Sequence, residues 1–170
     1  MANKYDDLIT QDVIKNILEY NQYSGKFIWK NCAGRRKRNG DTAGFKDSQG
    51  YVKIKIFGKS HFAHRVAFIY MTGRSPVEEI DHVNLVKDDN KWSNLREATR
   101  LQNSMNKWKR KHNRSGFKGV SFHKRCKKWV AQIQKNKKCY HLGYYKTPQE
   151  AYSIYIREAL RQHGKFAQIN

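Results

Sequence analysis

Residues 79–103 read EIDHVNLVKDDNKWSNLREATRLQN, and this stretch decides the fold and function expected of the chain. The chain is expected to run extended up to Ile80, and the polar part from Asp81 to Ser93 is typical of a loop. Neighbouring side chains on a strand point to opposite faces. Asp81 and His82 can therefore serve one site only where a strand ends or bends.

The residue types in this stretch suit phosphodiester hydrolysis. A neutral His near pH 7 can take a proton from an attacking water. A metal ion can stabilise charge on the departing oxygen, and Mg²⁺ prefers a few oxygen ligands while keeping waters and phosphates in its shell. Asp81 offers a carboxylate oxygen and Asn103 an amide oxygen. Asn residues in the loop can hydrogen-bond the backbone and hold its shape.

The Asp81-His82 pair, the spaced Asn94-Leu95-Arg96 and the later Gln102-Asn103 together resemble the HNH endonucleases, particularly the homing-type enzymes of phages and introns. The upstream run AHRVAF at residues 63–68, with Gly73, also matches that branch. The resemblance implies an α+β module, in which a strand pair and a helix wrap around one metal ion. It also implies hydrolysis of double-stranded DNA.

The resemblance assigns a role to each residue. His82 is expected to be the general base and Asp81 a metal ligand. Asn94 is expected to orient the loop and the catalytic His. Asn103 is expected to be the second metal ligand, at the position of the family's final His. The implied cofactor is one divalent ion, Mg²⁺ or Mn²⁺, with no zinc and no other small-molecule cofactor.

Three alternatives stay open at this stage. Asn106, one helical turn after Asn103, is a rival metal ligand, and Asn90 is a rival to Asn94. His64 is a second candidate histidine, but its place on an apolar helix favours a structural role.

The net charge indicates a polyanionic partner. The chain has 35 Lys and Arg against 14 Asp and Glu, a formal charge of +21. Such a charge repels itself in the folded state, and DNA phosphates would neutralise it. No acidic residue occurs between Glu97 and Glu150, which points to a binding face there. A membrane partner is not expected, because the chain has no long basic amphipathic helix and no apolar run near the roughly 20 residues of a membrane span.

The cysteines point to a reducing compartment. Cys32, Cys126 and Cys139 are far apart and form no Cys-x-x-Cys pair, which argues against a disulfide framework and a four-cysteine zinc site. The expected location is the cytoplasm, that of the host cell if a phage encodes the chain.

Local patterns predict several elements before residue 109. These are a helix capped by Thr10 and broken at Ser24-Gly25, a strand at 27–29, a basic loop over 30–50, a strand at 51–57, a turn at Gly58-Lys59, a helix at 62–71 stopped by Gly73, and a helix from Thr99 to about Trp108. The run Gly34 to Arg38 could lie along a DNA backbone or be a solvated loop.

Residues 116–164 resemble the ethylene-response-factor (Apetala-type) DNA-binding domain, which is also found fused to phage HNH endonucleases. The resemblance rests on KGV at 118–120, KWVA at 128–131, HLG at 141–143 and TPQEA at 147–151. Strands are expected at 117–123, 128–134 and 138–145, followed by a helix that Thr147, Pro148 and Glu150 open. In that family a three-stranded antiparallel sheet lies in the DNA major groove, with one helix behind it.

Strand alternation then assigns side chains to the two faces of this sheet. The helix-facing residues are expected to be Val120, Val130, Ile133 and Leu142. The DNA-facing residues are expected to be Lys118, Ser121, His123, Gln132, Gln134 and His141. Gln can read adenine bidentately. Phosphates are expected to contact Arg114, Lys124, Arg125 and Lys128, which position without specifying sequence.

The predicted organisation is therefore an extension at 1–50, an HNH nuclease domain at 51–108, a basic linker at 109–115 and an Apetala-type domain at 116–170. The predicted function is metal-dependent cleavage of double-stranded DNA at a recognised site. The alternatives are a DNA-binding regulator with an inactive nuclease module and an RNA-directed nuclease. The pattern is compatible with a monomer or a homodimer.

Overall fold

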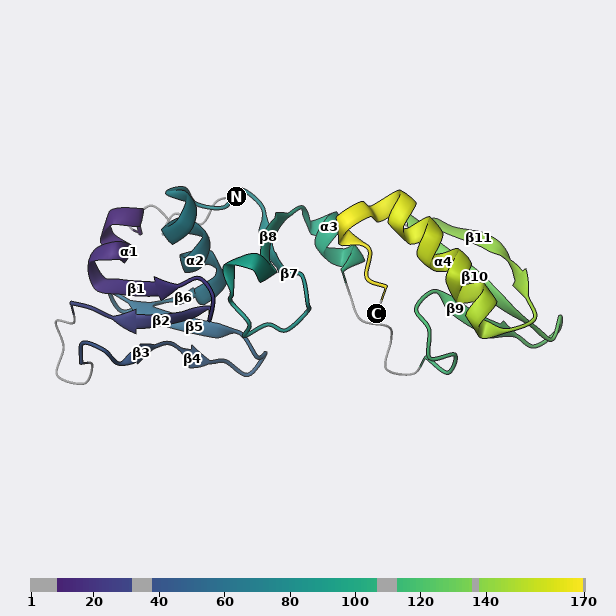
Figure 1. Cartoon of the computed structure of the whole chain (residues 1–170), viewed down its shortest axis with the longest axis horizontal. Helices are drawn as coiled ribbons and strands as arrows, with labels where there is room; N and C mark the ends of the chain where they lie inside the picture. The colour runs from purple at the N-terminus through teal and green to yellow at the C-terminus, as the bar shows by residue number, and fades with distance from the viewer. Residues whose placement is uncertain (1–8, 32–37, 107–112, 136–137, 170) are drawn as a thin grey trace. The chain divides into compact units, whose positions relative to one another are not determined.

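The computed structural model describes residues 9–31, 38–106, 113–135 and 138–169 (Figure 1). The chain divides into two compact units, Met1–Arg100 and Leu101–Asn170. Most of the predicted basic run at 34–38 and of the predicted linker at 109–115 lies outside the described residues. No helix in the described ranges is long and apolar enough to cross a membrane.

The first unit begins with helix α1 (Gln11–Ile17). The Thr10 hydroxyl accepts a hydrogen bond from the backbone N–H of Val13, which confirms the predicted cap. The helix is shorter than predicted, because Leu18–Asn21 forms strand β1 and pairs antiparallel with β2 (Lys26–Trp29). The short strand β3 (Thr42–Ala43) pairs with β2.

A second sheet contains β4 (Phe45–Lys46), β5 (Val52–Ile56) and β6 (Lys59–Phe62). The strand β5 was predicted, whereas β6 was not: a turn was expected at Gly58-Lys59 and the helix was expected to begin at Phe62. Helix α2 (Ala63–Thr72) follows at once and ends at Gly73, whose φ of 75° is left-handed, as the predicted glycine stop requires.

One apolar core anchors the elements of the first unit. It includes Ile14 of α1, Phe27 of β2, Ile54 of β5 and Val66 of α2. Figure 1 shows α1 and α2 next to these strands. Ile80 and Leu95 belong to the same core. They come from β7 (Glu79–His82) and β8 (Leu95–Ala98), an antiparallel pair linked by a loop that ends in the 3-10 turn η2 (Trp92–Asn94). The core therefore fixes the strand pair that carries Asp81 and His82.

The second unit contains α3 (Arg100–Met105), apart from its first residue, and a three-stranded antiparallel sheet with one long helix. The sheet is made of β9 (Val120–His123), β10 (Lys128–Lys135) and β11 (Lys138–Tyr145), with β10 in the centre. Helix α4 (Pro148–His163) packs along it, and the short turn η3 (Gly164–Phe166) follows (Figure 1). The three strands and the Thr147–Glu150 capping box are confirmed.

The prediction that Val130 faces α4 is wrong. Val130 pairs with Ser121 of β9 and Tyr144 of β11, whereas the next residue, Ala131, pairs with Val120 and packs against Ala151 of α4. Adjacent strand residues alternate between faces, so Val130 lies on the face opposite the helix. Ile133, two residues after Ala131, lies on the helix side again, against Tyr155.

Gly119 allows the sheet and α4 to approach closely, and this gives a test of the packing. A Cβ at Gly119 would lie 2.2 Å from the Tyr155 ring, whereas one at Gly116 would meet nothing within 4 Å; both glycines have positive φ. We expect Gly119→Ala to lower the free energy of unfolding of this unit by about 3 kcal/mol, and Gly116→Ala by about 1 kcal/mol. Amide hydrogen exchange in β10 reports this unit separately. Equal losses would contradict the close contact.

Candidate functional site

Asp81 and His82 are the last two residues of β7, and both are buried, with 3% and 5% of their surface exposed. Asp81 lies opposite Arg96 of β8. The Nε and one Nη atom of Arg96 donate to the same carboxylate oxygen, Oδ2 of Asp81, at 2.8 and 2.7 Å. Removing either member would leave a buried charge without its partner. Arg96 therefore fixes the orientation of the carboxylate, a role that the Asn-Leu-Arg pattern had not assigned to it.

Asn94 holds the loop between β7 and β8 in shape. Its Oδ1 accepts from the backbone N–H of Asn84 at 2.9 Å, and its Nδ2 donates to the carbonyl of Asp89 at 2.7 Å. Its own carbonyl accepts from the backbone N–H of Val83 at 2.9 Å. One buried carboxamide thus ties both ends of the loop together, directly after His82.

Asn90, rather than Asn94, contacts the His82 ring. Asn90 Oδ1 lies 3.2 Å from His82 Nε2, and Asn90 Nδ2 lies 3.3 Å from the carbonyl of Asp88. Because the Asp88 carbonyl can only accept, the Asn90 amide nitrogen must face it, so Oδ1 faces His82. His82 Nε2 then carries the proton, and Nδ1 keeps the lone pair that a general base needs.

Burial favours the neutral form of His82. It lowers the pKa of His82 below 6.5, while the Asn90 hydrogen bond and the Asp81, Asp89 and Asp88 carboxylates act in the opposite direction. The ring lies 6.1 Å from the Tyr51 ring and 5.1 Å from the His64 ring, measured between centroids. The surroundings therefore disfavour a charged resting imidazole, and the carboxylates would stabilise the charge once a proton arrives.

His64 is a neutral neighbour of His82. Its ring is stacked on Phe62 at 5.2 Å, and its Nδ1 is buried with no hydrogen-bond partner among the described residues. Burial, followed by the charges of His82 and Arg65, lowers the pKa of His64 to about 3. This environment fits the structural role that its apolar helix suggested.

The donor chemistry around Asp81 fits a hard cation held by few protein ligands. Within the described ranges, no three His, Cys, Asp or Glu side chains come together as a metal-binding group. A Mg²⁺ site does not need such a group, because this ion takes one or two carboxylates and completes its shell with water and phosphate. Asp81 provides a buried carboxylate whose orientation Arg96 fixes, as expected of a metal ligand supported by a second hydrogen bond.

Asn103 and Asn106, the two candidates for the second ligand, belong to the second unit. Asn103 is half-buried within α3, and Asn106, directly after the helix, is buried. The structure thus brings Asp81, His82, Asn90 and Asn94 together in the first unit. The choice between Asn103 and Asn106 stays a prediction.

The outer face of the second unit's sheet, opposite α4, contains most of the residues predicted to face DNA. Val120 and Ile133 point to the helix. The outer face therefore contains Ser121, His123, Lys128, Gln132, Gln134 and His141, with Gln132 directly opposite His141. Tyr144, which the sequence did not single out, joins them, because its ring lies 5.5 Å from that of His123 and 4.6 Å from that of His141.

The remaining predicted contacts lie at the margins of this sheet. Lys124 and Arg125 are exposed in the turn between β9 and β10, and Arg114 is exposed before β9. Lys118 differs from them, because it is half-buried and donates from Nζ to the carbonyl of Met105 at 2.9 Å. Burial lowers the pKa of Lys118 to about 8.

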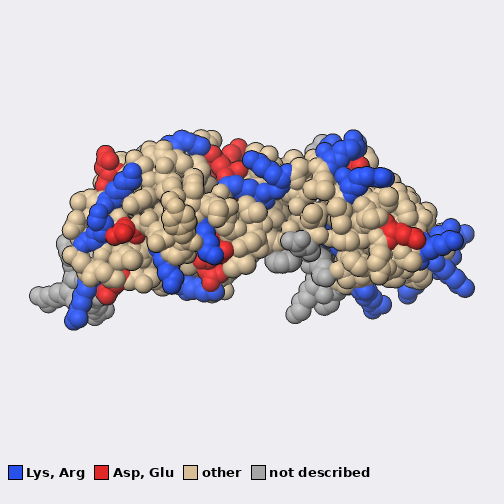
Figure 2. Space-filling view, viewed as in Figure 1, with Lys and Arg blue, Asp and Glu red and all other residues tan. Residues whose placement is uncertain are grey.

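The two units differ in charge. In Figure 2 the visible face of the second unit shows Lys and Arg with little Asp or Glu, whereas that of the first unit shows both signs. Residues 101–170 contain only two acidic residues, Glu150 and Glu158. Both are engaged within α4, in the capping box and with Arg161. The positive field that favours a polyanion therefore comes mainly from the second unit.

Comparison with known proteins gives one positive finding. Residues 61–105 match the family model described as HNH endonuclease. The match covers well under half of the chain, and it runs from β6 through α2, β7 and β8 to α3. No curated protein and no solved structure shows a significant match. The matched segment contains Asp81, His82, Asn94 and Asn103, and it supports a nuclease domain of the HNH type that acts on nucleic acid.

The pKa of His64 predicts acid sensitivity. Its folded-state pKa of about 3 lies below the unfolded value of 6.5, so the unfolded chain binds the proton more tightly. Stability is complete above the unfolded value and is lost as pH falls toward 3. We expect His64 to cost about 2 kcal/mol between pH 7.5 and about pH 5, and His64→Phe to remove this loss. Urea unfolding at both pH values measures it, with the half-buried His61→Phe as control. Unchanged sensitivity in His64→Phe would contradict the assignment.

Proposed function

We propose that the chain is a metal-dependent, homing-type endonuclease that hydrolyses double-stranded DNA at a recognised site. The observation that carries this proposal is the state of His82. The ring is buried at the end of β7, burial lowers its pKa, and Asn90 accepts from its Nε2. His82 Nδ1 then takes the proton of the water that attacks the phosphorus atom.

Asp81 and Asn103 would hold one divalent ion, Mg²⁺ or Mn²⁺. When bound, the ion supplies stabilisation of the charge on the phosphate and on the departing oxygen. The chain's own contribution is to hold the Asp81 carboxylate with Arg96 and to keep the loop rigid through Asn94. The HNH match continues through α3, which supports Asn103 as part of the same functional module.

The second unit would act as an Apetala-type domain that brings the nuclease to its target. Three features support this: its excess of Lys and Arg, its antiparallel sheet backed by one helix, and the polar residues on the sheet's outer face. Gln132 and His141 would contact base edges, while Lys124 and Arg125 would hold phosphates. A residence in the cytoplasm and an origin in a phage fit this proposal.

Removal of the base tests the catalytic part of the proposal. Cleavage sites are first mapped on genomic DNA with Mg²⁺ or Mn²⁺, and a plasmid carrying a mapped site is then the substrate. We expect His82→Ala to lower the single-turnover rate by at least about 100-fold and to leave DNA binding intact. EDTA should abolish cleavage by the wild type. His163→Ala, in α4 behind the sheet, is the control for a histidine outside the chemistry and outside the sheet's outer face.

Two results would contradict the nuclease assignment. One is full cleavage by His82→Ala, and the other is wild-type protein that binds DNA but cuts none, which would favour a DNA-binding regulator. Tighter binding to structured RNA than to duplex DNA at matched salt would favour an RNA-directed enzyme.

Substitutions in the second unit separate positioning from sequence reading. We expect Gln132→Ala to cost about 1–3 kcal/mol at the preferred site and to relax preference at one position. Lys124→Ala should weaken binding to all sequences equally and reduce its salt dependence. Selection of bound sequences from a random DNA pool, with titrations at two salt concentrations, measures both. An unchanged preference in Gln132→Ala would remove this residue from the reading face.

A further inference from the structure

The hairpin formed by β1 and β2 contacts the loop of residues 83–94, which follows His82. The Tyr20 hydroxyl donates to the carbonyl of Asn90 at 2.6 Å, and the backbone N–H of Trp92 donates to the carbonyl of Gln22 at 3.0 Å. At Gly25, a Cβ would lie 2.4 Å from the Asn90 carbonyl carbon. Residues 20–25 thus lie in close contact with residues 90–92 of the loop at three points.

Asn90 is the residue that these contacts fix, and it is also the residue that holds the His82 ring. It is buried, with 2% of its surface exposed. Its backbone carbonyl receives the Tyr20 hydroxyl, while its side-chain Oδ1 receives His82 Nε2. The separation between Tyr20 and Asn90 is 70 residues in sequence.

We propose that Tyr20 is a positioning residue of the nuclease, which acts through Asn90 to fix the ring and the tautomer of His82. This inference rests on the proposed function, because it assumes that His82 is the base. It makes the β1–β2 hairpin part of the catalytic machinery, although it lies outside the segment that matches the HNH endonucleases.

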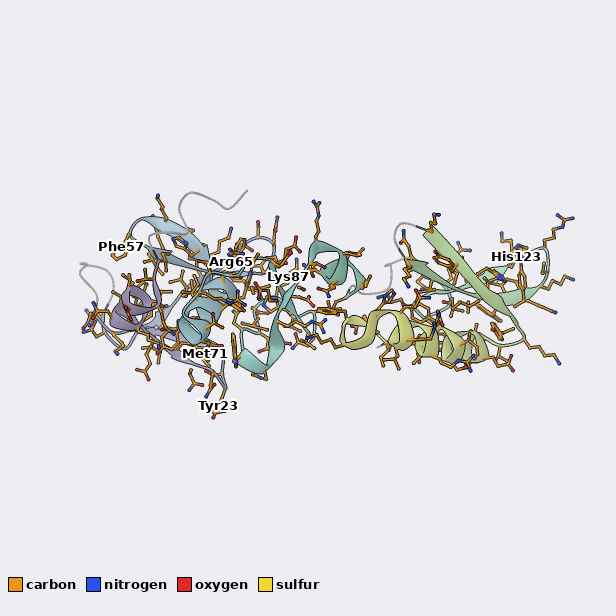
Figure 3. The ribbon with its side chains drawn as sticks, turned by 90° about the horizontal axis from the view of Figure 1, so that it is seen from above. Tyr23, Phe57, Arg65, Met71, Lys87 and His123 are labelled. Atoms are coloured by element: carbon orange, nitrogen blue, oxygen red, sulfur yellow. The ribbon has the colours of Figure 1, made fainter. Side chains whose placement is uncertain are left out.

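Tyr20 is suited to this task because it is rigid and remains a donor. Its ring is stacked on Phe27 at 4.6 Å and meets Tyr70 edge-on at 5.6 Å. Burial, followed by the charge of Asp89, raises the pKa of Tyr20, so the hydroxyl keeps its proton. The neighbouring Tyr23 is not packed in this way, because 80% of its surface is exposed and it points away from the hairpin (Figure 3).

The first test is Tyr20→Phe in the full chain, with the plasmid that carries a mapped site. The substitution keeps the packed ring and removes only the hydroxyl. We expect the single-turnover cleavage rate at saturating protein to fall about tenfold, with unchanged DNA affinity, because a small misplacement of the base is costly. Tyr70→Phe is the matched control: Tyr70 lies in the same ring cluster, and its hydroxyl makes no hydrogen bond within the described residues.

A second pair of variants addresses Asn90 itself. Asn90→Leu keeps a similar volume but removes the acceptor, and we expect a loss of about 100-fold in rate. Asn90→Asp restores an acceptor for His82 Nε2 and should retain more activity than Asn90→Leu. A fall in rate caused only by weaker folding would affect both variants without this order.

The imidazole nitrogens provide a readout that does not depend on cleavage. Two-bond proton–nitrogen NMR spectra distinguish the Nε2–H from the Nδ1–H tautomer, and the spectrum of His82→Ala assigns the His82 signals. We expect the Nε2–H form in wild type and a mixture in Tyr20→Phe. This measurement also applies if Asn90→Leu fails to fold.

The outcomes separate the two hypotheses. Full activity of His82→Ala would overturn the proposed function whatever Tyr20 does. An inactive His82→Ala together with wild-type rate and tautomer in Tyr20→Phe would overturn the positioning role alone. Equal losses in Tyr20→Phe and Tyr70→Phe, or a loss due entirely to weaker DNA binding, would also overturn it.

Discussion

The loop from Val83 to Asn94 lacks a sheet partner, so its backbone polar groups must find individual hydrogen bonds, and the site depends on this constraint. The Asn94 carboxamide satisfies the N–H of Asn84 near the start of the loop and the carbonyl of Asp89 near its middle. Asn84 adds a hydrogen bond to Asp89, and Tyr20 satisfies the carbonyl of Asn90. A loop closed in this way keeps one shape without regular structure, and it can therefore present His82 in one orientation.

The two units differ in how their charged side chains are arranged. In the first unit, several acids are engaged: Asp81 with Arg96, Glu97 with Arg74, and Asp88 with Lys46. The exposed pairs contribute little to stability, and each places an acid beside a basic side chain. The second unit has few acids to offset its Lys and Arg. Attraction of DNA over a distance needs an excess of positive charge, and this excess lies mainly in the second unit. Control of the protonation of His82 needs a few charged groups close to one ring, and these lie in the first unit.

The sequence predicted best what short-range signals control. The capping box at Thr147, the glycine stop at Gly73 and the alternation in β5 each depend on residues a few positions apart. The short strands β1, β3 and β6 were missed because their partners, rather than their own residues, determine them. The same limit applies at the site. Asp81 and His82 were found from a local pattern, whereas the contact between Tyr20 and Asn90 joins residues 70 positions apart. Asn90 and Asn94 have the same side chain, so the sequence alone could not tell them apart. Only the folded loop shows that Asn90 contacts the His82 ring and that Asn94 closes the loop.

Burial and the neighbouring charged groups act on the pKa of His82 in opposite directions. A base must be neutral before the reaction and stable as a cation during it. Loss of solvent favours the neutral ring, and the neighbouring carboxylates favour the cation. One of these carboxylates, Asp81, directly precedes His82, and the other two, Asp88 and Asp89, lie near the middle of the loop. A fixed acceptor at Nε2 adds to this balance, because it stabilises the cation while directing the lone pair to Nδ1. The orientation of one ring therefore links the loop geometry to the proton transfer, and any element that fixes Asn90 takes part in that link.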